Sequence, residues 1–418
     1  MIADPDKPRA WLERSRPVLS ALLFGGACVA LADAPAHDSQ AVAPIGGEPL
    51  SLAATVESPP LGLPKMDVPA DNPISEAKIS LGRKLFYDRR LSFNGTLSCA
   101  MCHVPEQGFT QNEMRTPVGM EGSFVKRNAP ALYNVGYRQR LFHDGREFSL
   151  ENQVWQPLLK ANEMANPSVG VVIERLERAA DYQGLFEAAF RRGPGIETIG
   201  QALASYQRGL VSAASSFDRW YFGGQPQLLG ESARRGFALF TSVGCSACHT
   251  IHKDHALFSD GQFHDTGIGY ARAMISPDPV AARVRLAPGV EVVPRVSFAR
   301  PPANDLGRYE ATGHAADRWK YLTPSLRNVA LTAPYMHDGS LPDLASVLHF
   351  YNKGGFAHSD LDPLLRPLDL SGLQLRDLEN FLRALTGDNV EHLARDGRST
   401  VIGDTGKEEE SAAPGDAF

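Results

Sequence analysis

Four of the five cysteines in this chain of 418 residues occur in two copies of one short motif, Cys-x-x-Cys-His. The copies read Cys99-Ala100-Met101-Cys102-His103 and Cys245-Ser246-Ala247-Cys248-His249. This motif attaches a c-type haem, because its two thiols form thioethers with the vinyl groups of one porphyrin and the histidine becomes an iron ligand. The sequence therefore predicts two covalently bound haems c, with His103 and His249 as their proximal ligands.

Other uses of the cysteines fit this spacing less well. A zinc site needs more ligands than either motif supplies locally, and a redox-active pair of thiols does not need the histidine. Five cysteines in a chain of this length are also too few for a scaffold held together by disulfides.

The composition is ordinary for a soluble globular protein, with 43% hydrophobic and 22% charged residues. Lys and Arg number 42 against 48 Asp and Glu, which gives a net charge of −6. Because nucleic-acid binding usually requires a basic face, we expect no nucleic-acid partner. The length allows two or three domains with cores of their own.

The first 32 residues have the order of a secretory signal: a basic segment, an apolar segment and small residues at the end. The apolar stretch 18–32 ends in Ala30-Leu31-Ala32. We therefore predict a signal peptide over 1–32, export to the periplasm, and no transmembrane span once the signal is removed. An uncleaved anchor and lipid attachment at Cys28 are the alternatives. Cleavage would remove Cys28, so that every remaining cysteine belongs to a haem motif.

Several motifs occur twice, which indicates an internal duplication. A Gly-x-x-Leu-Phe segment precedes each haem motif, at Gly82–Phe86 and Gly236–Phe240. Downstream, the related hexapeptides 130–135 and 324–329 are 194 residues apart, and each is followed at the same spacing by His-Asp-Gly. We predict a mostly α fold made of two cytochrome c-like haem domains related by internal duplication.

The repeat and the local composition also predict boundaries. In chain order we expect a signal peptide 1–32, a flexible leader 33–72, an N-terminal haem domain 73–228, a C-terminal haem domain 229–390 and a disordered tail 391–418. The Pro-rich stretch 277–302 is typical of a long surface loop. Apolar spacing predicts helices over 75–87, 172–191, 199–212, 232–240, 341–352 and 370–385.

The repeat makes the two haems unequal. Fourteen residues after the histidine of each His-Asp-Gly sequence lie Pro157 in the first half and Tyr351 in the second. A proline cannot ligate iron, whereas a phenolate can. We therefore expect the first haem to be open on its distal side and the second to be closed by Tyr351. The alternative for Tyr351 is ordinary packing of a helical side chain.

Gln153 and Glu163 flank Pro157 and are candidates for peroxide chemistry. A carboxylate can take a proton from the near oxygen of peroxide and return it to the leaving oxygen. An amide can orient the peroxide or a water. The alternative is that Glu163 is a surface acid.

Together these residues resemble the di-haem bacterial cytochrome c peroxidase and MauG family over roughly 72–387. Besides both haem motifs, the matching segments are Arg127-Asn128-Ala129-Pro130, Asp144-Gly145-Arg146, Glu163-Met164, Thr323-Pro324-Ser325-Leu326-Arg327-Asn328 and the run 331–340. The resemblance implies that the first haem reacts with peroxide and that the second transfers electrons.

The resemblance also implies roles for single residues. Gln153, Pro157 and Glu163 match the distal pocket of the peroxidatic haem. Tyr351 matches the distal ligand of the second haem in MauG-like members, where peroxidases use Met.

A Ca²⁺ ion between the haems is a further implication of the resemblance. Its ligands would be the side chain of Asn128 and the backbone carbonyls of Thr332 and Pro334. Oxygen ligands suit this hard cation.

The chain departs from the family pattern at two points. Peroxidases keep a displaceable histidine on the first haem, but no histidine occurs between His103 and His143. Activation by release of such a ligand is therefore not expected, although Met114 or Met120 could substitute. His143 itself stands where relatives place a charge-relaying Trp between the haems. Trp155 is a candidate stand-in, and a structural Trp is its simpler interpretation.

The predicted function is that of a periplasmic MauG-like oxidoreductase. It would use hydrogen peroxide at the open haem to oxidise a side chain of a partner protein through the haem ligated by Tyr351. One alternative is a cytochrome c peroxidase supplied with electrons by a small cytochrome or a copper protein. Another, of a different class, is a non-enzymatic di-haem electron carrier, which Pro157 disfavours because a carrier does not need an open iron.

Overall fold

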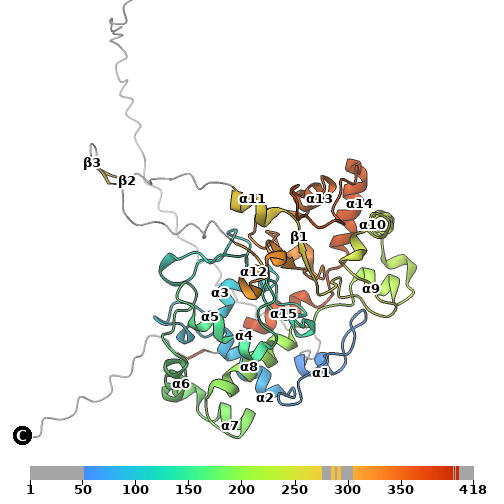
Figure 1. Cartoon of the computed structure of the whole chain (residues 1–418). Helices are drawn as coiled ribbons and strands as arrows, with labels where there is room; N and C mark the ends of the chain where they lie inside the picture. Colours follow the sequence, from blue (N-terminus) through green and yellow to red (C-terminus); the bar gives the residue numbers. More distant parts are fainter. Residues whose placement is uncertain are drawn as a thin grey trace, which may run out of the picture. The chain divides into compact units, whose positions relative to one another are not determined.

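Two closely packed helix pairs, one in each half of the chain, form the framework of the fold (Figure 1). The computed structural model describes residues 51–274, 284–287, 290–292, 305–398, 400 and 402–403. In the first half, α2 (Glu76–Tyr87) packs against α8 (Ile196–Gly209). In the second half, α10 (Glu231–Ser242) packs against α14 (Gly372–Arg383).

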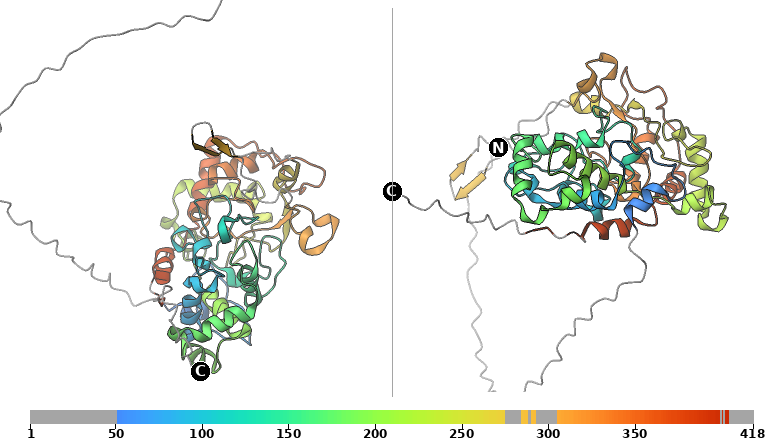
Figure 2. Two further views of the ribbon diagram at one scale, coloured as in Figure 1. Left: turned by 90° about the vertical axis from the view of Figure 1, so that its left-hand side faces the viewer. Right: turned by 90° about the horizontal axis from the view of Figure 1, so that it is seen from below.

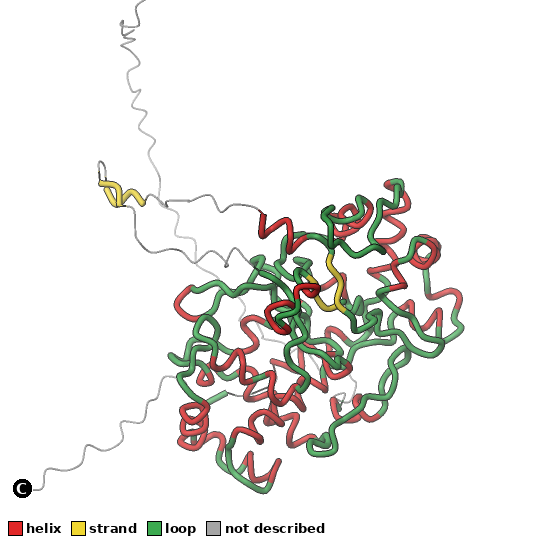
Figure 3. The backbone as a smooth tube through the Cα atoms, in the orientation of Figure 1, coloured by secondary structure: helices red, strands yellow, loops and turns green. Residues whose placement is uncertain are grey.

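Short helices and long connections surround these pairs (Figure 3). The other α-helices in the described part of the chain are α1 (Leu52–Glu57), α3 (Cys99–Cys102), α4 (Leu150–Gln153), α5 (Trp155–Leu159), α6 (Val169–Arg178), α7 (Leu185–Phe190), α9 (Ser216–Tyr221), α11 (Ile268–Met274), α12 (Tyr309–Thr312), α13 (Leu344–Asn352) and α15 (Val390–Arg398). The strands are β1 (Phe263–Asp265), β2 (Val284–Ala287), β3 (Val290–Val292) and β4 (Lys320–Leu322). The prediction of a mostly helical fold is confirmed.

Each helix pair depends on a glycine at its crossing. A Cβ atom on Gly82 would lie 1.9 Å from the carbonyl oxygen of Ala202 in α8, and one on Gly236 would lie 1.9 Å from that of Asp377 in α14. Only a residue without a Cβ allows the two backbones to approach so closely. Helix packing therefore explains the glycine of the repeated Gly-x-x-Leu-Phe segment.

The phenylalanine that ends this segment belongs to the core and lies beside the haem motif. Phe86 and Phe240 are 2% and 3% exposed. The ring centroid of Phe86 lies 6.5 Å from that of His103, and the centroid of Phe240 lies 6.4 Å from that of His249. The two helix pairs thus position the two histidines in the same way.

Local geometry recurs at the offset of 194 residues found in the sequence. Asn134 and Asn328 both adopt left-handed backbone, with φ of 59° and 60°, and each precedes a single 3-10 turn. Antiparallel bridges also occur at equivalent places, between Leu141 and Glu147 and between Tyr335 and Leu341.

The described strands form two small antiparallel sheets. β1 pairs with β4 so that His264 lies opposite Tyr321. β2 pairs with β3, and both fall within the stretch 277–302. The prediction of a loop is therefore wrong for these two strands, and the remainder of the stretch lies outside the described residues.

Most of the predicted helices are present, with ends that shift by a few residues. The exception is the helix predicted over 172–191, which the structure divides into α6 and α7. Gly184, at φ 77°, immediately precedes α7. A left-handed residue cannot continue a right-handed helix, so the apolar periodicity runs across a break.

The predicted flexible leader is ordered where the structure describes it. Leu52 and Val56 of α1 are 1% and 2% exposed, and the carbonyl oxygen of Gly62 accepts a hydrogen bond from the guanidinium of Arg327. Burial and this long-range bond hold the segment, so the prediction is wrong for residues 51–72.

The predicted disordered tail begins with a helix. In α15, Leu393 is fully buried in the core of the first half, and Asp396 pairs with Arg83 of α2 at 2.8 Å between the nitrogen and oxygen atoms. Figure 2 shows α15 in dark red against the helices of the first half. The prediction of disorder is therefore wrong for residues 391–398.

The predicted signal peptide 1–32, with Cys28, lies outside the described residues, as do leader residues 33–50 and most of the tail beyond 398. Among the helices that the structure describes, none is both long and apolar enough to cross a membrane.

Candidate functional site

A cavity of about 450 Å³ lies beside the first haem motif. Its walls include all six residues that the sequence assigns to the first haem: Cys99, Cys102, His103, Gln153, Pro157 and Glu163. Cys99 and Cys102 belong to α3, and His103 follows it directly. The other three come from α4, from α5 and from the connection that follows. A volume of this size falls in the range of cofactor pockets.

A backbone hydrogen bond orients the ring of His103. Its Nδ1 lies 3.0 Å from the carbonyl oxygen of Phe109, which leaves Nε2 free to bind a metal. Burial lowers the pKa of His103, so the imidazole is neutral, as an iron ligand has to be. Cys99 and Cys102 begin and end the single turn of α3 just before it.

Glu163 lines the cavity and is also ion-paired. Its carboxylate accepts a hydrogen bond from Nζ of Lys160 at 2.9 Å, and its side chain is 26% exposed. Burial raises the pKa of Cys102, and the negative charge of Glu163 raises it further. The carboxylate of Glu163 therefore lies close to the haem-binding thiols. The structure therefore makes Glu163 more than a surface acid.

Arg138 lines the same cavity and was not singled out from the sequence. Burial lowers its pKa to about 10. Its guanidinium contacts the carbonyl oxygen of Ala131 at 3.4 Å, and no carboxylate of the described residues pairs with it. A partly buried cation without a counter-charge is costly, and a haem propionate would supply that charge. The thiols, the imidazole and this cation together fit a haem.

The second haem motif repeats the orientation of the first. Nδ1 of His249 lies 2.8 Å from the carbonyl oxygen of Phe258, and burial lowers the pKa of His249. The neutral ring is therefore held with Nε2 available.

Tyr351 lies near the thiols of the second motif. It belongs to the last turn of α13. Burial raises the pKa of Tyr351, and the charges of Cys245 and Cys248 raise it further, an influence that requires the hydroxyl to be close to both sulfurs. This proximity is what an iron ligand needs. Ligation itself stays a prediction.

A polar cluster beside Cys248 was missed in the sequence, because its members come from separate segments. Nδ1 of His264 lies 2.6 Å from Asp362, and Nε2 lies 2.9 Å from Asp260. Cys248 and then the two carboxylates raise the pKa of His264 to about 10. Ligand atoms of Cys248, Asp260 and His264 lie within 4.8 Å of one another, so the free thiol could share a metal, whereas a thioether at Cys248 would remove that ligand.

Two of the three predicted calcium ligands lie together. Nδ2 of Asn128 donates to the carbonyl oxygens of Pro334 and Arg115, both at 3.1 Å. A calcium ion would need the amide oxygen of Asn128, not its nitrogen, to face these carbonyls.

The residues considered for the remaining roles at the first haem are not part of the cavity wall. Met114 is 41% exposed and Met120 is 5% exposed, and neither belongs to the cavity wall. Trp155 is buried in the core of the first half, where its indole N–H donates to the carbonyl oxygen of Ile196 at 3.2 Å. These positions favour a structural role for Trp155.

His143, at the position of the usual relay Trp, does line the cavity. Its Nε2 lies 3.0 Å from the carbonyl oxygen of Asn128. Burial and the charge of Arg127 lower the pKa of His143 to about 4, so the ring is uncharged at neutral pH.

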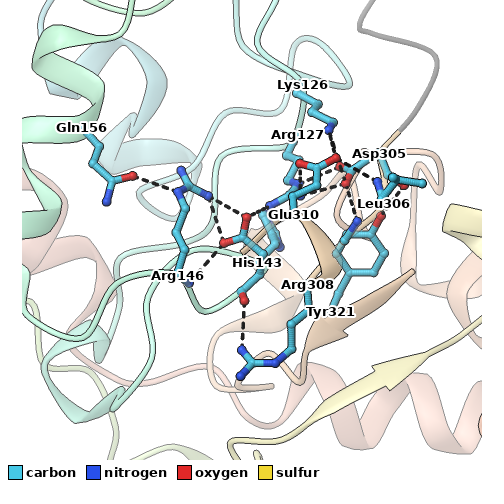
Figure 4. Close-up of polar contacts among 12 residues, drawn as sticks. Lys126, Arg127, His143, Arg146, Gln156, Asp305, Leu306, Arg308, Glu310 and Tyr321 are labelled. Atoms are coloured by element: carbon cyan, nitrogen blue, oxygen red, sulfur yellow. Dashed lines mark hydrogen bonds and ion pairs between the residues drawn. The ribbon is translucent and has the colours of Figure 1, made fainter. Parts of the chain in front are cut away.

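A network of charged residues joins the cavity to the second half of the chain (Figure 4). Arg127 binds Asp144 at 2.6 Å and both carboxylate oxygens of Asp305 at 2.6 and 2.7 Å. Glu310 accepts a further hydrogen bond from Arg127 at 3.2 Å. Arg146 also binds the carboxylate of Asp144. Only Arg127, Asp144 and Arg146 belong to motifs that the sequence could reveal.

Comparisons with known proteins identify the family of this chain. A family model described as di-haem cytochrome c peroxidase matches residues 76–226. The methylamine utilization protein MauG of Methylorubrum extorquens is 36% identical over 325 residues, which cover 77% of this chain and 81% of that protein. The chain belongs to the di-haem cytochrome c peroxidase and MauG family. It is therefore a haem-dependent oxidoreductase with two haems c.

Family members with different names match this chain about equally well. The cytochrome-c peroxidase IdrP1 of Denitromonas iodatirespirans is 34% identical over 351 residues, which cover 83% of this chain and 91% of that protein. A crystal structure described as a MauG-like protein associated with microbial copper homeostasis superposes with a TM-score of 0.65 at 32% identity, covering 79% of this chain and 95% of the other. Family membership alone does not choose between the two activities.

Proposed function

We propose that this chain is a periplasmic MauG-like oxidoreductase. It takes hydrogen peroxide at an open first haem and oxidises a side chain of a partner protein through a second haem ligated by His249 and Tyr351. The observation that supports the proposal is that the two haem sites differ in the residue expected on the distal side. Pro157 lines the first cavity, whereas Tyr351 lies beside the thiols of the second motif.

The haems, when bound, supply iron that peroxide can oxidise and that passes electrons on. Residues of the chain itself transfer the protons and orient the peroxide. Glu163 takes a proton from the near oxygen and returns it to the leaving oxygen, and Gln153 orients the peroxide. Lys160, bound to Glu163 at 2.9 Å, holds this carboxylate at the cavity wall.

Tyr351 would ligate the iron of the second haem. As a phenolate it would place an anionic oxygen on the second haem, and an anion stabilises oxidised iron better than the thioether of a methionine. The second site could then hold an oxidising equivalent until a partner protein supplies an electron.

The proposal includes the arrangement of the chain. The segments 73–228 and 229–390 are copies of one haem unit, which the recurrent geometry at Asn134 and Asn328 supports. A Ca²⁺ ion would bind near Asn128 and the carbonyl of Pro334 once the amide of Asn128 turns its oxygen toward this carbonyl. Export through the signal 1–32 brings the chain to the periplasm.

Addition of hydrogen peroxide to the diferric holoprotein tests this function. One equivalent should change the absorption of both haems, and the oxidised protein should decay slowly without a partner. Glu163→Gln should slow the reaction by a factor of about 10² to 10⁴. Glu174→Gln, at an exposed position on α6, is the matched control and should leave the rate unchanged.

Cytochrome c peroxidase is the second candidate, favoured by the similarity to IdrP1. Rapid turnover of peroxide with a reduced small cytochrome or copper protein would select it over the MauG-like activity. A first haem that is tightly ligated and does not respond to peroxide would overturn both and leave a di-haem electron carrier.

A further inference from the structure

Tyr321 occupies a position between the two candidate haem sites. In β4 it lies directly opposite His264 of β1, and a ring nitrogen of His264 lies within 4.8 Å of the sulfur of Cys248 in the second motif. The guanidinium carbon of Arg127, a residue of the first cavity wall, lies 5.6 Å from the ring centroid of Tyr321. One aromatic side chain is thus adjacent to residues of both sites.

The ring of Tyr321 stacks on that of His337. The two centroids are 3.6 Å apart and the ring planes differ by 9°. Tyr321 is 9% exposed and His337 is 7% exposed. A parallel, buried pair of rings overlaps its π systems and excludes water, which favours the passage of an electron.

The phenol of Tyr321 also has a place for its proton. Its hydroxyl donates to the backbone carbonyl oxygen of Asp305 at 3.3 Å and also hydrogen-bonds to the carboxylate of the same residue. Despite burial, Arg127 binds this carboxylate and lowers its pKa, so the carboxylate is ionised and can accept the proton. Burial raises the pKa of Tyr321, and the charge of Asp305 raises it further. The phenol is therefore protonated at neutral pH and has to release its proton when it loses an electron.

His143 does not offer the same chemistry, although it lines the first cavity. Its neutral imidazole is harder to oxidise than a phenol. A phenol that is buried, stacked and hydrogen-bonded is the better carrier of an oxidising equivalent in this region.

We propose that Tyr321, stacked on His337, relays single electrons from the second haem site to the first. The relay rests on the proposed function, because peroxide at the first site is the oxidant. Tyr321 gives one electron to the first site while its phenol proton moves to the ionised carboxylate of Asp305, with which the phenol also hydrogen-bonds. One electron from the second site then reduces the tyrosyl group and the proton returns. Tyr321 is regenerated, and the second site has lost one electron.

Tyr321→Phe in the holoprotein tests the relay, because phenylalanine keeps the stacked ring but cannot be oxidised in this way. After rapid mixing with peroxide, the absorption of the first haem should change at the wild-type rate. The response of the second haem should slow by roughly tenfold or more, which corresponds to a barrier higher by about 1.4 kcal/mol or more. Freeze-quenched wild-type protein should show a tyrosyl radical signal in electron paramagnetic resonance that the variant lacks.

Two further variants make the test specific. Tyr270 also stacks on a histidine, His358, at 4.4 Å and 7°, so Tyr270→Phe is the matched control and should leave both rates unchanged. Tyr321→Trp restores an oxidisable ring and should keep the transfer fast.

Three results would overturn the relay. They are a second-haem rate in Tyr321→Phe equal to that of wild type, an equal slowing in Tyr270→Phe, and a radical signal that survives in Tyr321→Phe. A wild-type first haem that ignores peroxide would be a different failure, because it would overturn the proposed function and the relay with it.

Discussion

At the scale of single residues, an ion pair ties α4 to α8 next to the first cavity. The carboxylate of Glu151 binds Arg208, with Nη2 and Oε2 3.1 Å apart, and accepts a further bond from Asn72 at 2.8 Å. Burial alone would raise the pKa of Glu151, but Arg208 and Asn72 lower it to about 2. Because Gln153 ends the same short helix, the pair also fixes a residue of the cavity wall.

Stability should therefore depend on pH through Glu151. Its pKa falls from 4.5 to about 2 on folding, so its contribution is complete above pH 4.5 and is lost as the pH falls towards 2. The amount is about 3 kcal/mol. Glu151→Gln should flatten the curve of unfolding free energy against pH in this window, whereas the exposed Glu174→Gln should not. A wild-type slope in Glu151→Gln would contradict the assignment.

At the scale of elements, two helix crossings set the positions of the haem motifs. The crossing of α2 with α8 lies at Gly82, and Phe86, about one turn farther along α2, packs near the ring of His103. The crossing of α10 with α14 has the same construction. A change at a crossing should therefore affect stability and haem binding together.

Gly82→Ala should destabilise the protein by about 1–3 kcal/mol, because the new methyl group would overlap the carbonyl oxygen of Ala202. This cost outweighs the gain in helix propensity of about 1 kcal/mol. Chemical denaturation and the haem content of the purified protein measure the effect. Gly372→Ala, at the start of α14 with no neighbouring atom within 4 Å, should change stability by no more than about 0.5 kcal/mol. Equal stability of the two variants would argue against a tight crossing.

At the scale of the whole molecule, long-range contacts join the parts of the chain around the two sites. Arg127 binds Asp305, and Arg327 binds both Asp218 and the carbonyl of Gly62. These contacts connect the N-terminal and C-terminal halves of the chain to each other and to the leader segment.

The sequence predicted the parts that depend on short motifs and periodicity. The haem motifs, the residues around Pro157 and most helices follow from such patterns, and the cavity indeed gathers the residues predicted for the first haem. The contacts of Asp305 and Tyr321 could not be predicted, because neither residue belongs to a motif that reveals which distant segment it meets. The order of the leader was missed for the same reason, since its bond to Arg327 is visible only in the fold.

The central claim is that the two haem irons differ in their distal ligands. The electron paramagnetic resonance spectrum of the diferric holoprotein tests this claim most directly. We expect one high-spin signal from the open first haem and one low-spin signal from a second haem ligated by His249 and Tyr351. In Tyr351→Phe, the low-spin signal should be replaced by a second high-spin signal. Two low-spin haems in the wild-type protein, or a low-spin signal unchanged in Tyr351→Phe, would contradict the account.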